Sequence, residues 1–446
     1  MCREDERIAK ALKPAAEAMR LHPFYRGKIE IGVKCKVEDL QDFATWYSPG
    51  VAAPCQAITA DKESVYQHTN KGNFVAVVSD GTRVLGLGDI GPEAALPVME
   101  GKALLFKYLG GVDAFPVCVG SKDPDQIIEF VKLLQPTFGA INLEDIASPK
   151  CFYILERLRQ ECEIPVWHDD QQGTATVVLA ALINALRYVN KDLRDVQIAM
   201  IGAGAANICI TKLLIAAGAD PGKIYVTDSQ GILHRDRCPD LQARHRQKYD
   251  LALITNAAGR RGGIAEAMKD CDVVIALAQP GPDLIHPTWV QAMAPNPICF
   301  FCANPTPEMW PWQAKAAGAA VVATGRSDFP NQVNNSICFP GIFRGVLDVQ
   351  AAAITDEMCL TAAYTIADVG AEKGIDPNQL LPAMDNAEVF IRQAVNVGRK
   401  AIELGLARQN LTAAALREKA TAAITRARSV TKLLMEQGII AKPPAW

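Results

Sequence analysis

Apolar residues recur along the first half of the chain in short blocks, which alternate with stretches of helical spacing. Two such blocks, residues 139–143 and 164–167, are separated by residues 149–162, where apolar side chains follow a helical period. This order of strand, helix and strand predicts two neighbouring parallel strands, because the crossover returns the chain to the same end of the sheet. Both carboxyl ends then fall at one edge, where open α/β sheets bind ligands.

The same alternation extends through residues 74–189 and predicts a parallel sheet covered by helices. The remaining strands of this part are expected at residues 74–78, 83–89 and 114–119. Helices are expected at residues 8–21 (ended by Pro23), 97–108 (opened by Pro97), 125–134 and 174–188.

A second unit begins near residue 193 and has the pattern of a doubly wound, Rossmann-type sheet. Its strands are expected at residues 196–201, 223–227, 272–278, 297–303 and 319–324. After residue 334 the chain turns helical to the end. The prediction is an α/β protein with a parallel-sheet domain at 1–190, completed by helices at 335–446, and a dinucleotide-binding domain at 191–334.

Composition is typical of a globular protein. The 446 residues are 49% hydrophobic and 21% charged. The formal net charge of −3 does not indicate a protein that binds nucleic acid. The thirteen cysteines are scattered, and the Cys-x-x-Cys of Cys299 and Cys302 lies in an apolar block, so free thiols in a reducing compartment are expected. The charged start lacks the apolar segment of a signal peptide, and no apolar run approaches the ~18 residues of a membrane span, so a cytoplasmic protein without membrane partners is expected.

Carboxylates follow both of the neighbouring strands. Glu144 and Asp145 come after the first strand, and Asp169 and Asp170 come after the second. Like charges at one edge raise one another's pKa, and a divalent cation that prefers oxygen ligands, Mg²⁺ or Mn²⁺, would compensate them. Any one of these acids could instead cap a helix, but two doublets at equivalent strand ends favour a metal site.

A glycine-rich turn marks the candidate cofactor site. Gly202, Gly204 and Ala205 lie between a strand and a helix, and Asp228 ends the next strand, 26 positions after Gly202. Such glycines let a pyrophosphate approach the helix N-terminus, and the acid suits the ribose hydroxyls of NAD. Asn207 replaces the third glycine of the pattern, so the helix–strand contact should be looser or shifted. NADP stays open, because a basic segment follows that could also be a solvated surface: Arg235, Arg237, Arg244, Arg246 and Lys248.

The other candidate residues could have structural roles instead of catalytic or binding ones. Lys102, within a predicted helix, could be a solvated side chain or, partly buried beside a dication, a base with a lowered pKa. Tyr47 alone could be a core residue and Arg83 a surface residue, while Asn304 and Asn335 could form Asx turns.

The motifs occur in one order along the chain: Tyr47-Ser48-Pro49-Gly50-Val51, residues 80–89, Gly101-Lys102, Leu143-Glu144-Asp145, residues 168–174, Gly202-Ala203-Gly204, Asn304-Pro305-Thr306 and residues 334–341. This series resembles the malic enzymes, particularly the short bacterial kind, over roughly residues 42–348. Residues 350–446 match poorly and receive no role beyond helical packing.

The resemblance implies a role for each candidate. Glu144, Asp145 and Asp170 would be the metal ligands, with Lys102 as general base, Asp169 beside it, Tyr47 as general acid, Arg83, Asn304 and Asn335 as substrate contacts, and Gly202, Gly204, Ala205, Asp228 and Asn304 at the cofactor. The expected reaction is the oxidative decarboxylation of L-malate to pyruvate and CO₂ with NAD or NADP and Mg²⁺ or Mn²⁺, in a homodimer or higher homo-oligomer. The sequence leaves open which subunit supplies Tyr47 and Lys102 to one site.

Two alternatives stay open from the sequence. A metal-dependent lyase that converts malate to lactate with retained NAD would use the same ligands. A catalytically silent dinucleotide-sensing protein would use the acids only as helix caps, although the complete set of acids with Lys102 and Tyr47 argues against it.

Overall fold

The first sheet holds the two acid-ended strands as neighbours, as predicted. A computed structural model describes residues 3–444 and shows four parallel strands in the order β2-β1-β3-β4. In the pairing of β3 with β4, Ile141 lies opposite Val166 and Leu143 opposite His168. The strands are β1 (Phe74–Ser79), β2 (Asp113–Cys118), β3 (Ala140–Leu143) and β4 (Val166–His168).

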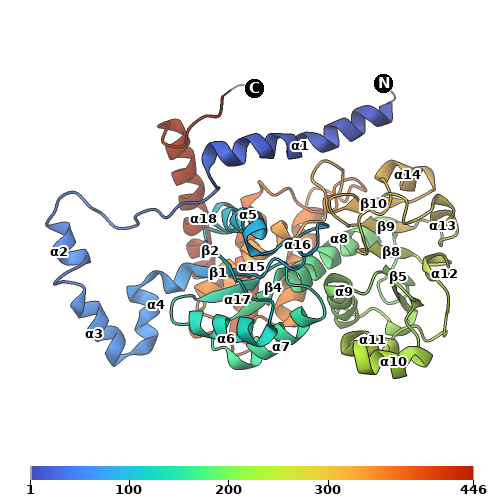
Figure 1. The fold of residues 1–446 in the computed structure, drawn as a ribbon, viewed down its shortest axis with the longest axis horizontal. Helices are drawn as coiled ribbons and strands as arrows, with labels where there is room; N and C mark the ends of the chain where they lie inside the picture. Colours follow the sequence, from blue (N-terminus) through green and yellow to red (C-terminus); the bar gives the residue numbers. More distant parts are fainter. Residues whose placement is uncertain (1–2, 445–446) are drawn as a thin grey trace.

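Helices on both sides of this sheet connect its strands (Figure 1). The helix α6 begins where Asp123 caps the N–H groups of Asp125 and Gln126, with Pro124 in the first turn. The helix α5 begins at Pro92 instead of the predicted Pro97, because Pro92 occupies the favoured first position after Gly91. The four bounds are α5 (Pro92–Gly110), α6 (Pro124–Leu134), α7 (Lys150–Glu161) and α8 (Thr174–Val189).

The strand predicted at residues 83–89 is wrong. This segment forms a tight turn in which Val84 N–H donates to Gly88 O at 2.9 Å. Leu85 has a φ of 48°, which breaks an extended run, so the apolar alternation here belongs to a loop and not to the sheet.

The second sheet has six strands in the order β10-β9-β8-β5-β6-β7. Five are parallel, and the two-residue β7 pairs with β6 in the antiparallel sense, a strand that the sequence reading missed. The carboxyl ends of β8 and β9 are joined by buried Glu308, which accepts from Ala278 N–H at 3.0 Å and Ala303 N–H at 3.1 Å. The strands are β5 (Ile198–Ile201), β6 (Ile224–Asp228), β7 (Gly231–Ile232), β8 (Val273–Ala276), β9 (Ile298–Phe301) and β10 (Val321–Thr324).

Helices also cover this second sheet, at α9 (Ala205–Ala216), α10 (Cys238–Arg244), α11 (Arg246–Ile254), α12 (Ile264–Met268), α13 (Pro287–Gln291) and α14 (Pro311–Ala316). Cys299 and Cys302 are buried at β9, as the structural reading of that motif predicts.

The helices after residue 335 pack onto the first sheet. Phe343 on α15 lies edge-on to Phe106 of α5 and to Trp167 of β4, and the buried Arg344–Asp348 ion pair closes at 2.9 Å on the same helix. The sequence therefore predicted correctly that this tail is helical. Its bounds are α15 (Phe339–Asp348), α16 (Asp356–Ala371), α17 (Ala387–Glu403) and α18 (Ala413–Glu436). The proposed division at residues 190 and 334 stays a prediction.

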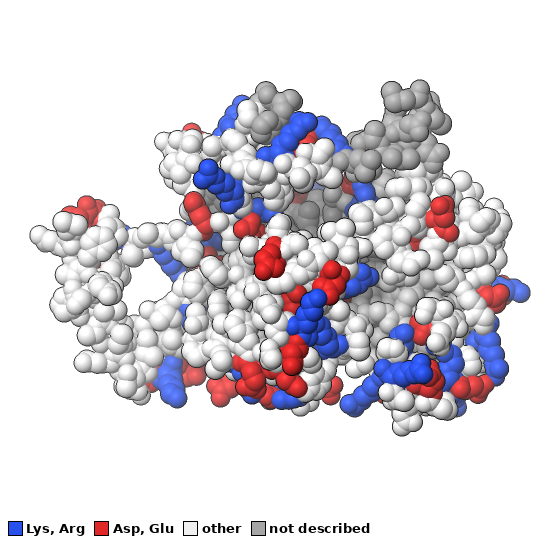
Figure 2. Space-filling model, in the orientation of Figure 1, with Lys and Arg blue, Asp and Glu red and all other residues white. Residues whose placement is uncertain are grey.

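The N-terminal region packs onto this body only in part: Tyr25 Oη–H donates to Ala441 O at 2.8 Å and Glu63 pairs with Arg408 at 3.3 Å, whereas its second and third helices bury no residue. It consists of α1 (Arg3–Tyr25), α2 (Asp42–Trp46), α3 (Ala52–Ala60) and α4 (Val65–His68). The first helix continues through Pro14 and Pro23 to Tyr25, four residues beyond the predicted end at residue 21, so the prediction that Pro23 ends it is wrong. Figures 1 and 2 show α2 and α3 projecting sideways, with open space between them and the body. No helix in the described part of the chain is both long and apolar enough to cross a membrane.

Candidate active site

Three carboxylates converge where β3 and β4 end. Glu144, Asp145 and Asp170 each offer an oxygen, and these oxygens lie within 4.8 Å of one another. Asp145 Oδ2 is buried without a hydrogen-bond partner among the described residues. A buried, unpartnered carboxylate oxygen beside two other carboxylates fits a hard divalent cation, so the donor set suits Mg²⁺ or Mn²⁺.

The backbone holds this cluster in place. Asp145 has a φ of 56° and donates its N–H to Asp170 Oδ2 at 2.8 Å, while its carbonyl accepts from Arg83 N–H at 3.0 Å. Burial, followed by the charge of Asp170, raises the pKa of Asp145 to about 8. Burial also raises the pKa of Glu144 well above its usual range. Both shifts express chiefly the cost of burying a carboxylate, to which the neighbouring carboxylates add.

Lys102 points from α5 into the same corner. Its Nζ lies 2.5 Å from Asp169 Oδ2, 2.9 Å from Glu144 Oε1 and 4.4 Å from the centre of the Phe339 ring. Burial lowers the pKa of Lys102, but Asp169 and Glu144 raise it, and the net shift is upward. The lowered pKa expected from the sequence applies to a lysine beside a bound dication and stays a prediction. Without a cation, contact with two carboxylates keeps the pKa of Lys102 above its usual value.

Asp169 is completely buried, and several contacts fix its position. Trp167 Nε1–H donates to Asp169 Oδ1 at 3.0 Å, and Asn335 Nδ2–H donates to Asp169 Oδ2. A Cβ at Gly173 would lie 2.1 Å from Asp169 Oδ1, so this position has no room for a side chain. The predicted residues Lys102, Asp169 and Asn335 are thus brought together.

Arg83 and Asn304 border this corner from two loops. Arg83 is exposed, its Nη1–H donates to Leu85 O at 3.3 Å, and its charge acts on the pKa of Asp170. The loop of Arg83 meets Asn304 from the second sheet: a Cβ at Gly86 would lie 2.3 Å from Asn304 O. Arg83 therefore lies close enough to the acidic cluster to act on Asp170, and Asn304 lies against the loop that carries Arg83.

The glycine-rich turn has the geometry of a phosphate-binding loop. Gly202 has a φ of 100°, Gly204 precedes the first turn of α9, and α9 packs against the turn of residues 169–173. Asn207 does not loosen the contact as predicted. It is fully buried, and its Nδ2–H₂ group donates to Ile201 O at 2.7 Å and to Gly202 O at 2.9 Å, which ties the helix to the strand.

Asp228 lies at the end of β6, where it was predicted, but cations already contact it. Arg237 approaches both carboxylate oxygens at 2.9 Å, and Lys248 Nζ lies 3.0 Å from Oδ2. The basic segment after β6 is therefore partly folded onto the acid and is not a wholly solvated surface.

Tyr47 is not brought to this site. It ends α2 in the projecting region and is 74% exposed, so within one chain the proposed general acid and the proposed base stand on separate parts of the molecule.

Three residues that were not predicted from the sequence lie beside the acidic residues of the site. Asn142 Nδ2–H donates to Glu144 Oε2 at 2.9 Å, and Trp167 orients Asp169. His168 is fully buried with its Nδ1 3.6 Å from Asp170 Oδ2, and burial lowers its pKa to about 4. A polar Asn142 within an apolar strand was the signal that could have identified the first of them.

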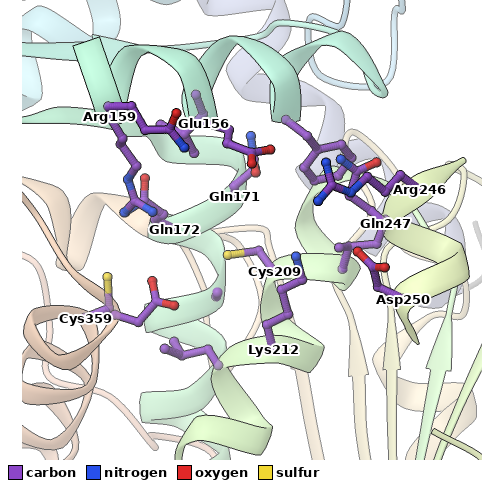
Figure 3. A pocket seen from close by; sticks show the side chains of 17 residues that line it. Glu156, Arg159, Gln171, Gln172, Cys209, Lys212, Arg246, Gln247, Asp250 and Cys359 are labelled. Carbon is purple, nitrogen blue, oxygen red and sulfur yellow. The ribbon is translucent and has the colours of Figure 1, made fainter. Parts of the chain in front are cut away.

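A cavity of about 390 Å³ lies behind the acidic cluster, between α7 and α9. Figure 3 shows Arg246, Gln247 and Asp250 on the opposite side of it from Glu156 and Gln171. Gln171 lies next to Asp170 in the chain, but no member of the acidic triad lines the cavity.

Comparisons with known proteins agree with this geometry. Residues 26–159 match the family description "Malic enzyme, N-terminal domain" and residues 171–402 match "Malic enzyme, NAD binding domain". The "Bifunctional malic/malolactic enzyme" of Bacillus subtilis is 48% identical over 88% of this chain and 94% of its own length. The "NAD-dependent malic enzyme" of Geobacillus stearothermophilus is 47% identical over 86% of this chain and 78% of its own.

Solved structures extend the match to the C-terminal helices, which the sequence resemblance did not reach. The malic enzyme of Entamoeba histolytica superposes with a TM-score of 0.94 at 46% identity and covers 99% of this chain and 91% of that one. The malic enzyme of Pyrococcus horikoshii gives 0.88 at 48% identity, over 92% of this chain and 95% of that one. The chain belongs to the malic enzyme family and is an NAD(P)-dependent malic enzyme.

Proposed function

We propose that this malic enzyme converts L-malate to pyruvate and CO₂ at the corner formed by Glu144, Asp145 and Asp170, with Lys102 as the general base. The observation that carries the proposal is the convergence of three carboxylates around the unpartnered Asp145 Oδ2, with Lys102 Nζ in contact with Glu144 and Asp169. This convergence supports a proposal in which an oxygen-rich cation site and a nitrogen base lie beside one another.

The three carboxylates would hold Mg²⁺ or Mn²⁺. When bound there, the cation supplies Lewis-acid polarisation of the substrate's C2 oxygen, both as hydroxyl and, after oxidation, as carbonyl. The turn of Gly202, Gly204 and Ala205 would hold NAD(P), which would supply a hydride acceptor beside C2.

With Glu144 engaged by a cation, its charge would stabilise the Lys102 ammonium group less, and Lys102 in its neutral form would take the proton from the C2 hydroxyl as hydride leaves C2. Asp169 holds the ammonium group through a 2.5 Å contact, and Asn335 and Trp167 hold Asp169 in turn. This chain of contacts fixes the position of the base, which is the requirement for proton transfer in the transition state. Loss of CO₂ from the β-keto acid then leaves enolpyruvate, which takes a proton at C3, and Tyr47 is the proposed donor.

Arg83, Asn304 and Asn335 would contact the substrate carboxylates. They come from three separate segments: Asn335 contacts Asp169, and the loop that carries Arg83 meets Asn304. Arg83 is suited to a two-pronged contact with a carboxylate, because its guanidinium presents parallel N–H donors. Asp228 would lie at the ribose, and the neighbouring Arg237 and Lys248 leave both NAD and NADP as candidates.

Formation of free NAD(P)H with L-malate tests this function directly. The purified chain should reduce NAD or NADP only when Mn²⁺ or Mg²⁺ is added, with pyruvate and CO₂ formed in equal amounts. Absence of metal-dependent reduction with either cofactor would contradict the proposal.

A second candidate, conversion of malate to lactate, is favoured by one observation: the Bacillus subtilis relative is described as bifunctional malic/malolactic. The same ligands would serve, and the reduced cofactor would stay bound and return its hydride to pyruvate. Lactate formed without accumulation of NADH would support this activity.

A further inference from the structure

The cavity behind the acidic cluster lies between the two sheets of the molecule and takes no part in the proposed reaction. Its volume of about 390 Å³ is within the range of small-molecule sites, roughly 300–1,000 Å³. One wall is formed by α7, the turn of residues 169–173 and the start of α16, and the other by α9 and α11 of the dinucleotide-binding part. A ligand in this cavity would therefore contact both parts of the chain.

Both walls of the cavity are charged, and the majority sign differs between them. The first wall has two acids and one base, and the second has one acid and two bases. The six residues are Glu156 and Arg159 of α7 and Asp356 of α16 on the first wall, and Lys212 of α9 with Arg246 and Asp250 of α11 on the second. Figure 3 shows Arg159 and Arg246 on opposite sides of the cavity.

These charges are not compensated within the chain. Over the described residues, 3–444, none of the six side chains forms an ion pair, and Arg159 donates to a backbone carbonyl, Ile354 O, at 2.8 Å. All of them except Arg159 are exposed, so a ligand can reach them from solvent. The cavity thus offers charged groups of both signs that are free to bind a ligand.

Two buried donors of the cavity wall also lack acceptors. Arg159 Nε and Gln172 Nε2 are each buried without a hydrogen-bond partner in the described part of the chain, and Gln172 is only 3% exposed. The thiol of Cys359, beside Gln172, is at most a weak acceptor. Because buried donors are nearly always paired in native proteins, their presence here indicates that the cavity receives a polar molecule.

The mixture of charges selects the class of ligand. A dicarboxylate or phosphate would be attracted by Lys212 and Arg246 but repelled by Glu156 and Asp356, and a diamine would meet the reverse. A zwitterion suits both walls, with its carboxylate toward the two bases and its ammonium group toward the two acids. Apolar side chains that would contact its carbon atoms also line the cavity: Phe152, Leu155, Ile208 and Leu213.

The cavity is joined to the active site through two elements. Gln171 and Gln172 belong to the turn that begins with Asp169 and Asp170, and Gln172 Oε1 accepts from His168 N–H at 3.0 Å. The helix α9, which lines the second wall, begins directly after the glycine-rich cofactor turn and packs against the turn of residues 169–173. A ligand that holds these elements together would therefore change how the cofactor turn is presented.

We propose that this cavity is an effector site for a small zwitterion of the class of free α-amino acids, and that its occupation is coupled to binding of NAD(P). Lys212 and Arg246 bind the carboxylate, and Glu156 and Asp356 bind the ammonium group. The site is separate from the acidic triad, none of which lines the cavity.

Calorimetry on the purified chain, without malate or NAD(P), tests binding. L-Glutamine is the probe, because it carries one carboxylate, one ammonium group and an amide that suits the amides of Gln171 and Gln247. It should bind with one site per chain, and neither succinate nor 1,4-diaminobutane should displace it. Absence of glutamine binding would overturn the proposal, as would displacement of glutamine by succinate or by inorganic phosphate.

Variants of both walls test the location of the site. K212A/R246A and E156Q/D356N should each weaken binding of L-glutamine at least about tenfold, because each loses two charge-assisted contacts. The matched control is R244A, since Arg244 is an exposed cation near Arg246 that does not line the cavity. Unchanged binding in both double variants, or an equal loss in R244A, would overturn the site.

The coupling is tested without turnover. Saturating L-glutamine should change the Kd for NAD(P) by about fivefold or more in the wild type and leave it unchanged in K212A/R246A. Glutamine binding without any change in the Kd for NAD(P) would overturn the effector role. A chain that shows the coupling but does not oxidise malate with Mn²⁺ would support the effector site and contradict the proposed function instead.

Discussion

Replacing Lys102 by methionine removes the ammonium group that lies between Glu144 and Asp169 while keeping the length of the side chain. Both ion pairs are buried: the side chain of Lys102 is 7% exposed, that of Glu144 5% and that of Asp169 0%. Removing one partner of a buried ion pair costs about 3–5 kcal/mol, because the remaining charges lose their compensation. We expect a loss of that size in the metal-free protein at pH 8.

The loss should depend on pH, and its sign follows from the carboxylates. Burial already raises the pKa of Glu144, and removal of Lys102 raises it further. The folded variant then holds a proton that the unfolded chain releases above its ordinary pKa of about 4.5, so its stability falls as pH rises. The difference from wild type should therefore be small near pH 5 and large near pH 8.

Urea unfolding in EDTA at both pH values measures this difference. The control is K107M on the same helix, where Lys107 is 48% exposed and pairs with Asp113 at 2.6 Å, and where an exposed pair predicts a loss of about 0–1 kcal/mol. Adding Mn²⁺ should restore more stability to K102M than to wild type, while turnover stays reduced by about 10²–10⁴-fold. Equal losses for K102M and K107M, a loss independent of pH, or near-normal turnover would refute the reasoning.

Three further outcomes are expected. D170N should weaken Mn²⁺ binding by at least about tenfold, measured by calorimetry without substrate, because one of three carboxylate ligands is lost. N207A should raise the KM for NAD(P) and cost about 1–3 kcal/mol of unfolding free energy, since the carbonyls of Ile201 and Gly202 lose their buried donor. Burial raises the pKa of Glu308 to about 7, so wild-type stability should fall by up to about 3 kcal/mol between pH 4.5 and 7, a slope that E308Q should lack in thermal unfolding scans.

The local sequence pattern was sufficient to predict the first sheet and the positions of the acidic residues at its edge. Glu144 and Asp170 could be placed together because a strand, a helix and a strand within thirty-odd residues allow one common handedness, and the carboxyl ends then coincide. The same reasoning located the turn of Gly202, since its chemistry depends on the strand before it and the helix after it.

The features of the site that could not be predicted from the sequence depend on contacts between residues that are far apart in the chain. The upward pKa shift of Lys102 depends on Asp169, 67 positions away, and the role of Asn335 depends on a contact across 166 positions. The loop at residues 83–89 has a strand-like alternation, but no neighbouring strand offers it a partner.

The meeting of Gly86 with Asn304 has a consequence for how the two lobes can approach each other. Here the backbone of Gly86 lies directly against the backbone of Asn304. The methyl group of an alanine at position 86 would therefore push the two segments apart. The separation of the two sheets at this contact is therefore set by two backbone segments, and it depends on a hydrogen in place of a side chain at Gly86.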